Sequence, residues 1–397
     1  MKKRIWLVYP LVYVCLLISQ CRLALAQENW SINGFVAQGI QQASKTNFVS
    51  SDGDLSFALT EIGVNGRYAI DEDLSLNAQA VYLNAGRRYP EGARVDYLFL
   101  DWRVVDANNL NLNVHLGRYK NYHWLYSSTR DVPHTRPGNL LPQSVYFDSF
   151  RDVALGSDGV AIRASTTNRF GDWEFNWSYG KSPVSRESTV QLLGHNSSGK
   201  VSQDHDHQMS VYWRSFSSGL LFGVSWLDAD FTYNQGLNDG FVNGKVNVQR
   251  VALAAQWQSQ YVELTTELVR ESSAYNDVLA PNFFSDTSAE GGYVQLNVMP
   301  LPKLTGLFRL DLYDQNKEDR NGFALEQATN GAIPNYFAYM DTATVGVRYL
   351  LADNIALQAE FNRIKGAGRL TPLLVRTTET TESEYWDLWS LQFMYWF

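Results

Sequence analysis

The amino-acid sequence predicts an all-β fold, an antiparallel up-and-down transmembrane β-barrel of about sixteen strands with a long third loop folded into its lumen. Three observations lead to this fold class. Segments of about ten residues alternate between apolar and polar side chains, as strands do when their two faces meet different surroundings. The links between these segments alternate between short and long. After the N-terminal segment, no run of about 18 apolar residues could form a membrane-spanning helix.

The N-terminus has the pattern of a secretory signal peptide. A basic start at residues 2–4 precedes an apolar stretch at 5–18, and the small residues Ala24 and Ala26 frame a cleavage site. We therefore expect residues 1–26 to be removed and residues 27–397 to form the outer-membrane barrel. A lipoprotein signal ending at Cys21 and an uncleaved anchor are the weaker alternatives, because Gln20 fits poorly before a lipidated cysteine and the apolar stretch is short.

Without this leader the chain is acidic and free of cysteine. Both cysteines and four of the 33 basic residues lie in the leader, whereas all 41 acidic residues lie after it, so the remaining net charge is near −12. This acidic balance argues against nucleic acid as a partner. Aromatic residues make up 14% of the chain, which suits a fold rich in strands.

Sixteen alternating segments are joined by seven short links and eight longer polar loops. Short turns at one end of a barrel and long loops at the other are typical of outer-membrane barrels. The predicted strands are 30–42, 55–70, 74–85, 93–105, 110–119, 159–167, 172–181, 203–216, 220–233, 245–258, 261–273, 291–299, 303–315, 337–350, 354–365 and 385–397. The predicted long loops are 43–54, 86–92, 120–158, 182–202, 234–244, 272–290, 316–336 and 366–384.

The same alternation predicts which side chains face lipid and which face the lumen. In the strand at 110–119, Leu112 and Leu116 are expected to face lipid while His115 faces inward. In the last strand, every second residue counted back from Phe397 is aromatic or leucine. This strand resembles the C-terminal strand that Gram-negative outer-membrane proteins present to the barrel assembly machinery.

The longest loop, residues 120–158, shows no sustained alternation. Loops of this length are usually functional or disordered. Trp124, Leu140, Leu141 and Tyr146 supply apolar surface that can pack, so we expect an ordered loop that enters the lumen and narrows it. A loop packed on the rim without a role in transport is the alternative.

Three short matches carry a family resemblance: Ile32–Gly39 (INGFVAQG), Leu116-Gly117-Arg118 before the third long loop, and the terminal Phe397. With them, the chain resembles the sixteen-stranded porins of the Gram-negative outer membrane. The loop sequence RDVPHTRPGNLLPQSVY at 130–146, followed by SDGV at 157–160, is further similar to an uncharacterised porin-like group from gammaproteobacteria.

The resemblance implies a homotrimer in the cell outer membrane, in contact with lipid and lipopolysaccharide, that passes small hydrophilic solutes. It also implies assembly through the Phe397 strand and a third loop that forms the constriction. General porins carry a mostly acidic third loop facing a basic wall. In this chain the loop instead mixes both signs, with Arg130, His134, Arg136 and Arg151 beside Asp131, Asp148 and Asp152.

The candidate pore-lining residues come from this loop and from inward positions of the strands. Arg130 and Arg136 are the leading candidates; in the alternative interpretation they pair with Asp131 and Asp148 and lock the loop. Inward acidic positions include Glu61, Glu263, Glu267 and Glu360, and the two signs either face each other across the lumen or interleave as ion pairs. The full candidate set is Arg130, Asp131, His134, Arg136, Asp148, Arg151, Arg67, Arg103, Arg163, Arg309 and Arg348.

Catalytic and metal-binding interpretations have less support. The six histidines form no motif that specifies a nucleophile with its base. His205 and His207 alternate along one strand, which would suit a metal, but surface polar residues explain them better. We therefore predict no catalytic residue, metal or cofactor. The predicted function is passive diffusion of small hydrophilic solutes and ions; the alternatives are a plugged barrel acting as a receptor or adhesin and, with less support, an outer-membrane hydrolase.

Overall fold

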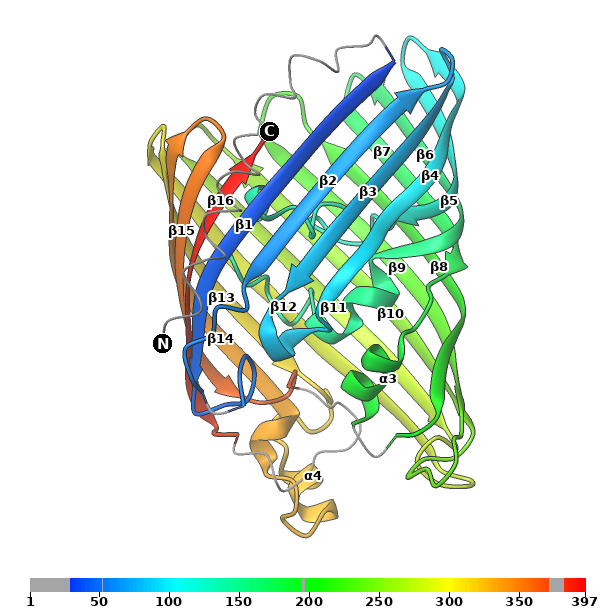
Figure 1. Cartoon of the computed structure of the whole chain (residues 1–397), viewed down its shortest axis with the longest axis vertical. Coiled ribbons are helices and arrows are strands. Elements are labelled where there is room, and N and C mark those ends of the chain that lie inside the picture. The colour runs from blue at the N-terminus through cyan, green and yellow to red at the C-terminus, as the bar shows by residue number, and fades with distance from the viewer. Residues whose placement is uncertain (1–28, 52, 195–196, 371–381) are drawn as a thin grey trace, which may run out of the picture.

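The computed structural model is a closed antiparallel barrel of sixteen strands, which confirms the predicted fold class (Figure 1). It describes residues 29–51, 53–194, 197–370 and 382–397, so the predicted signal peptide lies outside the described residues. Every strand pairs with its neighbours in the sequence, and the first pairs with the last. The strands are β1 (Trp30–Ser44), β2 (Thr60–Ala69), β3 (Leu74–Asn84), β4 (Gly92–Ala107), β5 (Leu110–Lys120), β6 (Gly156–Asn168), β7 (Gly171–Lys181), β8 (Lys200–Arg214), β9 (Leu220–Asn234), β10 (Gly244–Gln258), β11 (Val262–Asn276), β12 (Phe284–Leu301), β13 (Leu304–Asp314), β14 (Tyr339–Ala352), β15 (Ile355–Gly366) and β16 (Tyr385–Trp396).

The helices of the described part are short and lie in the long loops. The one-turn helix η3 precedes β4, three more helices lie between β5 and β6, α3 follows β7, and α4 and η6 lie between β13 and β14, with α4 beyond the ends of the strands (Figure 1). Within the described residues, no helix has the length and apolar character needed to cross a membrane. The helices are η3 (Gly86–Arg88), η4 (Pro133–Thr135), η5 (Asp148–Phe150), α2 (Arg151–Ala154), α3 (Arg186–Leu193), α4 (Phe323–Ala328) and η6 (Asn335–Ala338).

The chain ends close the barrel. Strands β1 and β16 pair from Phe35 opposite Trp396 to Ser44 opposite Asp387. One residue beyond the ladder, Gly34 and Phe397 exchange two backbone hydrogen bonds of 3.0 and 2.9 Å. Closure leaves no strand edge, and an open edge would leave backbone groups unpaired in lipid.

The outer surface is apolar, as the alternation predicted. On β13, Phe308, Leu310 and Leu312 point outward with 53%, 63% and 58% of their surface exposed, whereas the intervening Arg309 and Asp311 are buried inside. Leu116 on β5 and Phe393 on β16 are also exposed outward. An apolar outer surface around a polar interior is the arrangement that a bilayer requires of a strand-built wall.

The largest boundary error concerns β12. The sequence predicted a strand from 291 and a loop over 272–290, but β12 begins at Phe284 and the loop is only 277–283. The added part of the ladder pairs polar residues, such as Ser273 with Thr287 and Tyr275 with Ser285. It was missed because apolar alternation marks only the part of a strand that meets lipid, while backbone pairing continues beyond it.

Two irregularities in β4 change which side chains face inward. Pairing with β3 shifts between Gln79 and Ala80, and pairing with β5 shifts between Arg103 and Val105. A bulge places two residues opposite one and so reverses the inside-outside alternation beyond it. As a result Asp96 points into the lumen while its neighbour Val95 is 47% exposed outside.

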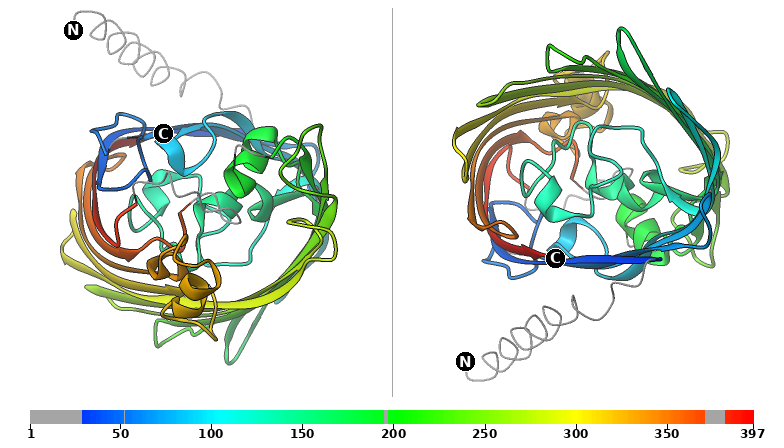
Figure 2. Two further views of the ribbon diagram at one scale, coloured as in Figure 1. Left: turned by 90° about the horizontal axis from the view of Figure 1, so that it is seen from below. Right: turned by 90° about the horizontal axis from the view of Figure 1, so that it is seen from above.

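The loop between β5 and β6 lies inside the ring of strands when the barrel is viewed along its axis (Figure 2). Its apolar side chains Trp124, Leu141 and Tyr146 pack on Ala252 of β10, Val269 of β11 and Tyr293 of β12 in one buried cluster. The wall therefore carries inward apolar residues where the loop rests. Burial of this surface explains why so long a loop is ordered.

Candidate functional site

The candidate site is the loop across the lumen, residues 121–155, together with the wall side chains that hold it. Its two ends are fixed by the last rung of the β5–β6 ladder, which pairs Lys120 with Gly156. At Gly138 the chain passes so close to the Glu360 carboxylate that a Cβ atom would collide with it. This close approach lets Glu360 accept a hydrogen bond from the Asn139 amide at 2.8 Å.

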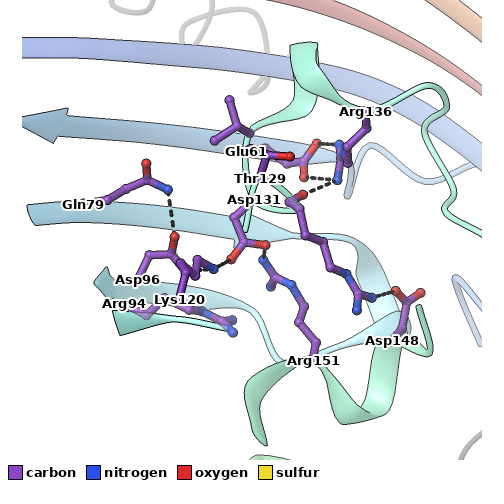
Figure 3. A network of polar contacts seen from close by, with 12 residues as sticks. Glu61, Gln79, Arg94, Asp96, Lys120, Thr129, Asp131, Arg136, Asp148 and Arg151 are labelled. Atoms are coloured by element: carbon purple, nitrogen blue, oxygen red, sulfur yellow. Dashed lines mark hydrogen bonds and ion pairs between the residues drawn. The ribbon is translucent and has the colours of Figure 1, made fainter. Parts of the chain in front are cut away.

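One end of the loop is joined to the wall by a chain of four alternating charges (Figure 3). Asp131 lies between the Lys120 ammonium, at 2.9 Å, and the Arg151 guanidinium, and Lys120 also pairs with Asp96 of β4. All four side chains are buried. Burial alone would raise the pKa of Asp131, but Arg151 and Lys120 hold it well below its usual range. Asp131 therefore stays ionised between its two cations.

Asp148 binds two arginines at once. Its carboxylate lies 2.8 Å from Arg88 Nε of η3 and 2.7 Å from Arg130 Nη2. Burial acts to raise the pKa of Asp148, and the two guanidinium groups outweigh it and lower that pKa. Arg130, a leading candidate for a pore-lining residue, is thus held in a buried ion pair within the loop.

Arg136 makes a second link to the wall, at β2, which is two strands from β4 in the ring. Its guanidinium forms a two-pronged ion pair with Glu61 of β2, with N–O distances of 2.9 and 2.5 Å. Gln392 of β16 donates a third hydrogen bond to the same carboxylate at 2.9 Å. A buried, bidentate arginine–carboxylate pair is among the stronger polar contacts in proteins.

Carboxylates of the facing strands accept hydrogen bonds from backbone amides and side-chain hydroxyls of the loop. Glu267 of β11 accepts hydrogen bonds from the Leu125 amide at 3.0 Å and from the Tyr146 hydroxyl at 2.5 Å. Asp311 of β13 accepts from the hydroxyl and amide of Ser144. The loop is therefore bonded to strands on both sides of the barrel.

Wall arginines bind the loop carbonyl groups. Arg309 donates to the Leu140 carbonyl at 2.9 Å, and Arg348 donates to the His134 carbonyl at 3.0 Å. Arg163 donates to the Lys120 carbonyl and lies 3.9 Å above the Tyr122 ring. Three of the predicted wall arginines thus contact the loop or its base.

The remaining predicted wall arginines lie away from the loop. Arg67 of β2 is exposed, and Arg103 of β4 pairs with Asp106 at 2.6 Å beside a short turn. His134 belongs to the loop and stacks on Trp396 of β16, with ring centroids 4.6 Å apart. Burial, aided by Arg348 and Arg136, lowers the pKa of His134 to about 4, so its ring is neutral near pH 7. The side chain of Asp152 lies outside the described part of the structure.

Three residues of this site were not among the sequence candidates: Arg88, Asp96 and Lys120. Asp96 escaped because the β4 bulge reverses the alternation on which the inward assignment relied. Arg88 and Lys120 lie at the edges of predicted loops, where alternation assigns no face. The sequence carries one signal for them, because basic residues are concentrated beside these strand ends. Charged residues are rarely buried unless they are paired, so buried basic residues here would need acidic partners nearby.

Among the described residues, no group of three or more His, Cys, Asp or Glu side chains is placed to hold a metal ion. His205 instead lies 3.2 Å from Asp228 on the neighbouring strand, and His207 accepts a hydrogen bond from the Trp177 indole at 2.8 Å.

Comparison with known proteins identifies the architecture. No protein-family model matches the chain, and no curated protein matches its sequence. Solved structures do match. Pseudomonas putida OprB is 10% identical, with a TM-score of 0.58 over 96% of this chain and 97% of its own. An anion-selective porin from Comamonas acidovorans is 12% identical, with a TM-score of 0.57 over 93% of this chain and 99% of its own. Salmonella typhi OmpF, solved in complex with daunomycin, is 12% identical, with a TM-score of 0.54 over 93% and 98%.

These likenesses extend over nearly the whole length of both chains in each pair, so they concern the complete barrel. With the sixteen-strand closure, the apolar outer surface and the loop across the lumen, they lead to one conclusion: the protein has the closed sixteen-stranded β-barrel fold of these porins.

Proposed function

We propose that the protein is a passive diffusion channel for small hydrophilic solutes and ions, with the loop at 121–155 as its constriction. The observation that carries the proposal is the anchoring of this loop across a polar lumen, by Glu61 of β2 on one side and by Glu267 and Asp311 on the other. A fixed loop with fixed charges is sufficient to select solutes by size and charge.

Two cavities beside the loop, each with charged residues in its lining, support this proposal. One, of about 290 Å³, is lined by charged residues including Asp96, Lys120 and Arg151 at the long-loop end. The other, of about 210 Å³, lies between the loop and strands β10 to β15. A solute that passes the loop would move between such water-filled spaces, and the paired charges around Asp131 and Arg136 would set the local field.

The test is single-channel current of the refolded protein in a planar bilayer, together with the reversal potential across a salt gradient. We expect stepwise conductance and a measurable ion preference. Persistent silence from protein shown to be folded and inserted would contradict the open-channel function.

A plugged barrel that acts as a receptor or adhesin is the second candidate. It is favoured by one specific observation: loop residues 138–149 are all buried, and hydrogen bonds join them to β15 and β11. A barrel closed by this loop would be silent in its native form and would conduct once the loop is removed. Comparing the native protein with the loop-deleted protein in the same bilayer therefore distinguishes the two functions.

We further propose export through the predicted signal peptide, contact with outer-membrane lipid and lipopolysaccharide, and assembly by the barrel assembly machinery through the Phe397 strand. We also propose a homotrimer. A solved Vibrio cholerae OmpT structure of similar fold, 11% identical with a TM-score of 0.52, is described as a trimer form. The role is transport rather than catalysis, and the aqueous path would need no cofactor.

A further inference from the structure

The cavity of about 210 Å³ lies between the loop and the inner wall of strands β10 to β15. The loop supplies Thr135 and Arg136 to its lining, and the wall supplies carboxamides such as Asn297 and Gln358. Drug-sized ligand sites enclose ~300–1,000 Å³, so this cavity suits a smaller polar solute.

Four charged residues line the cavity, and two of them are already neutralised. Arg136 is paired with Glu61, and Glu360 accepts the Asn139 and Leu140 amides of the loop beside Arg309. These two charged groups already bind the loop or its partners, so they have few hydrogen-bonding positions left for a solute.

The other two, Glu263 and Arg348, have no ionic partner among the described residues. Glu263 of β11 accepts one hydrogen bond, from the Asn297 amide group at 2.9 Å. Arg348 of β14 donates to neutral oxygens only: the Gln358 carboxamide at 2.5 Å and two loop carbonyl groups. Both side chains are partly exposed. One cavity is therefore lined by a carboxylate and a guanidinium whose charges are not neutralised by an ion pair within the described residues.

The strand register fixes how these two charges are placed. Glu263 lies opposite Asn297, Asn297 opposite Leu307, and Leu307 opposite Gly346, which is two residues before Arg348. Three strand spacings of ~4.8 Å separate the two backbones by about 14 Å, and both side chains reach inward from there. The carboxylate and the guanidinium form no ion pair with each other across this separation, so they can act at opposite ends of one solute.

We propose that this cavity is a binding site for a small zwitterion, an amino acid or short peptide, whose ammonium group binds Glu263 and whose carboxylate binds Arg348. Charge-assisted hydrogen bonds at both ends give affinity, and the separation of the charges selects solute length. The inference rests on the proposed function for solute access, because a zwitterion reaches the cavity through the aqueous lumen.

The test is calorimetric titration of refolded protein in detergent with glycine, 4-aminobutyrate and 6-aminohexanoate. Two probes with one charge each, butyrate and butylammonium, serve as controls. We expect the longer zwitterions to bind more tightly than glycine. We expect the single-charge probes to bind at least about tenfold more weakly, since a hydrogen bond to a charged group is worth ~1.5–3 kcal/mol. Equal binding of butyrate and 4-aminobutyrate would overturn the proposal.

Substitutions test which residue binds each charged end of the zwitterion. Glu263→Gln and Arg348→Gln are each expected to weaken zwitterion binding about tenfold, while Arg348→Lys keeps the charge and retains most of the affinity. Glu174→Gln on β7 and Arg67→Gln on β2 remove exposed charges outside this cavity and should leave binding unchanged. Loss of binding in these two control variants as well, or retention in Glu263→Gln, would contradict the assignment.

Binding in detergent does not require conduction, so the two proposals fail separately. Zwitterion binding by a protein that is silent in bilayers would overturn the channel and leave the site standing. Conduction without zwitterion binding would overturn the site and leave the channel standing.

Discussion

At the residue scale, the loop is held by ion pairs that are buried and satisfied on both sides. Asp131 and Asp148 each contact two cations, and Arg136 uses both terminal nitrogens on Glu61. Removing one partner of a buried pair is far more costly than the pair's net contribution, because the remaining charge is left unpaired away from water. These residues therefore control where the loop lies.

Replacing Arg136 with Ala is expected to lower the thermal stability of the loop arrangement without unfolding the barrel. The cost is about 3–5 kcal/mol, because Glu61 stays buried without its guanidinium. The freed carboxylate should shift ion preference towards cations. Melting temperature and reversal potential measure the two effects. Arg67→Ala, on the same strand as Glu61, removes an exposed arginine and serves as the matched control. Unchanged stability and current in Arg136→Ala would show that the pair is dispensable.

Arg130→Ala is a second test of the loop, since it removes one of two cations from Asp148 while Arg88 remains. We expect a smaller loss of stability than in Arg136→Ala, with a change in conductance or ion preference and a folded barrel. The same two measurements apply. A loss larger than that of Arg136→Ala would contradict the shared role of Arg88.

His134 makes the loop arrangement sensitive to acid. Its pKa is lowered from 6.5 to about 4, so the folded state keeps the ring neutral while a released loop would protonate it between these values. Release then takes up protons, and stability falls as pH drops from about 6.5 to about 4. The melting temperature of wild type relative to His134→Gln should decline across this window and stay level above pH 7. A constant difference at every pH would refute the assignment.

At the scale of elements, the loop at 121–155 and the wall are matched to each other. The wall offers Ala252, Val269 and Tyr293 where the loop is apolar, and Glu267 or Glu360 where loop amide groups need acceptors. Sequence alternation predicted the inward positions of Glu267 and Glu360. It could not predict their partners, because contacts across a lumen join residues up to some 250 positions apart, such as Asn139 with Ser390.

Deleting residues 121–155 and joining Lys120 to Gly156 by a short Gly-Ser turn should enlarge the conductance and lower the melting temperature. The ends are already adjacent in the β5–β6 ladder, so the barrel can still close, but Glu267 and Glu360 lose their loop partners. Shortening the loop that carries α4, which extends beyond the strand ends in Figure 1, is the control and should leave conductance unchanged. An unaltered conductance after deletion of 121–155 would remove the loop from the transport path.

At the scale of the whole molecule, the barrel is a sequential meander in which each strand pairs with its neighbour and the ends meet through Gly34 and Phe397. Long-range pairing is thus needed only once, between β1 and β16. For the intact assembly we expect three copies. Native mass spectrometry of detergent-extracted protein measures this directly, and a monomer under conditions that keep the barrel folded would contradict the trimer.

The sequence alone determined the fold class, the number of strands, the two classes of connection and the lipid-facing residues. Each of these depends on local alternation, which the bilayer imposes on every strand in the same way. Only the tertiary structure decided the partners of the loop charges, the inward turn of Asp96 at the bulge and the shared cavity of Glu263 and Arg348. These features depend on register and on the path of a loop across the lumen, and neither is encoded by the alternation of any single strand.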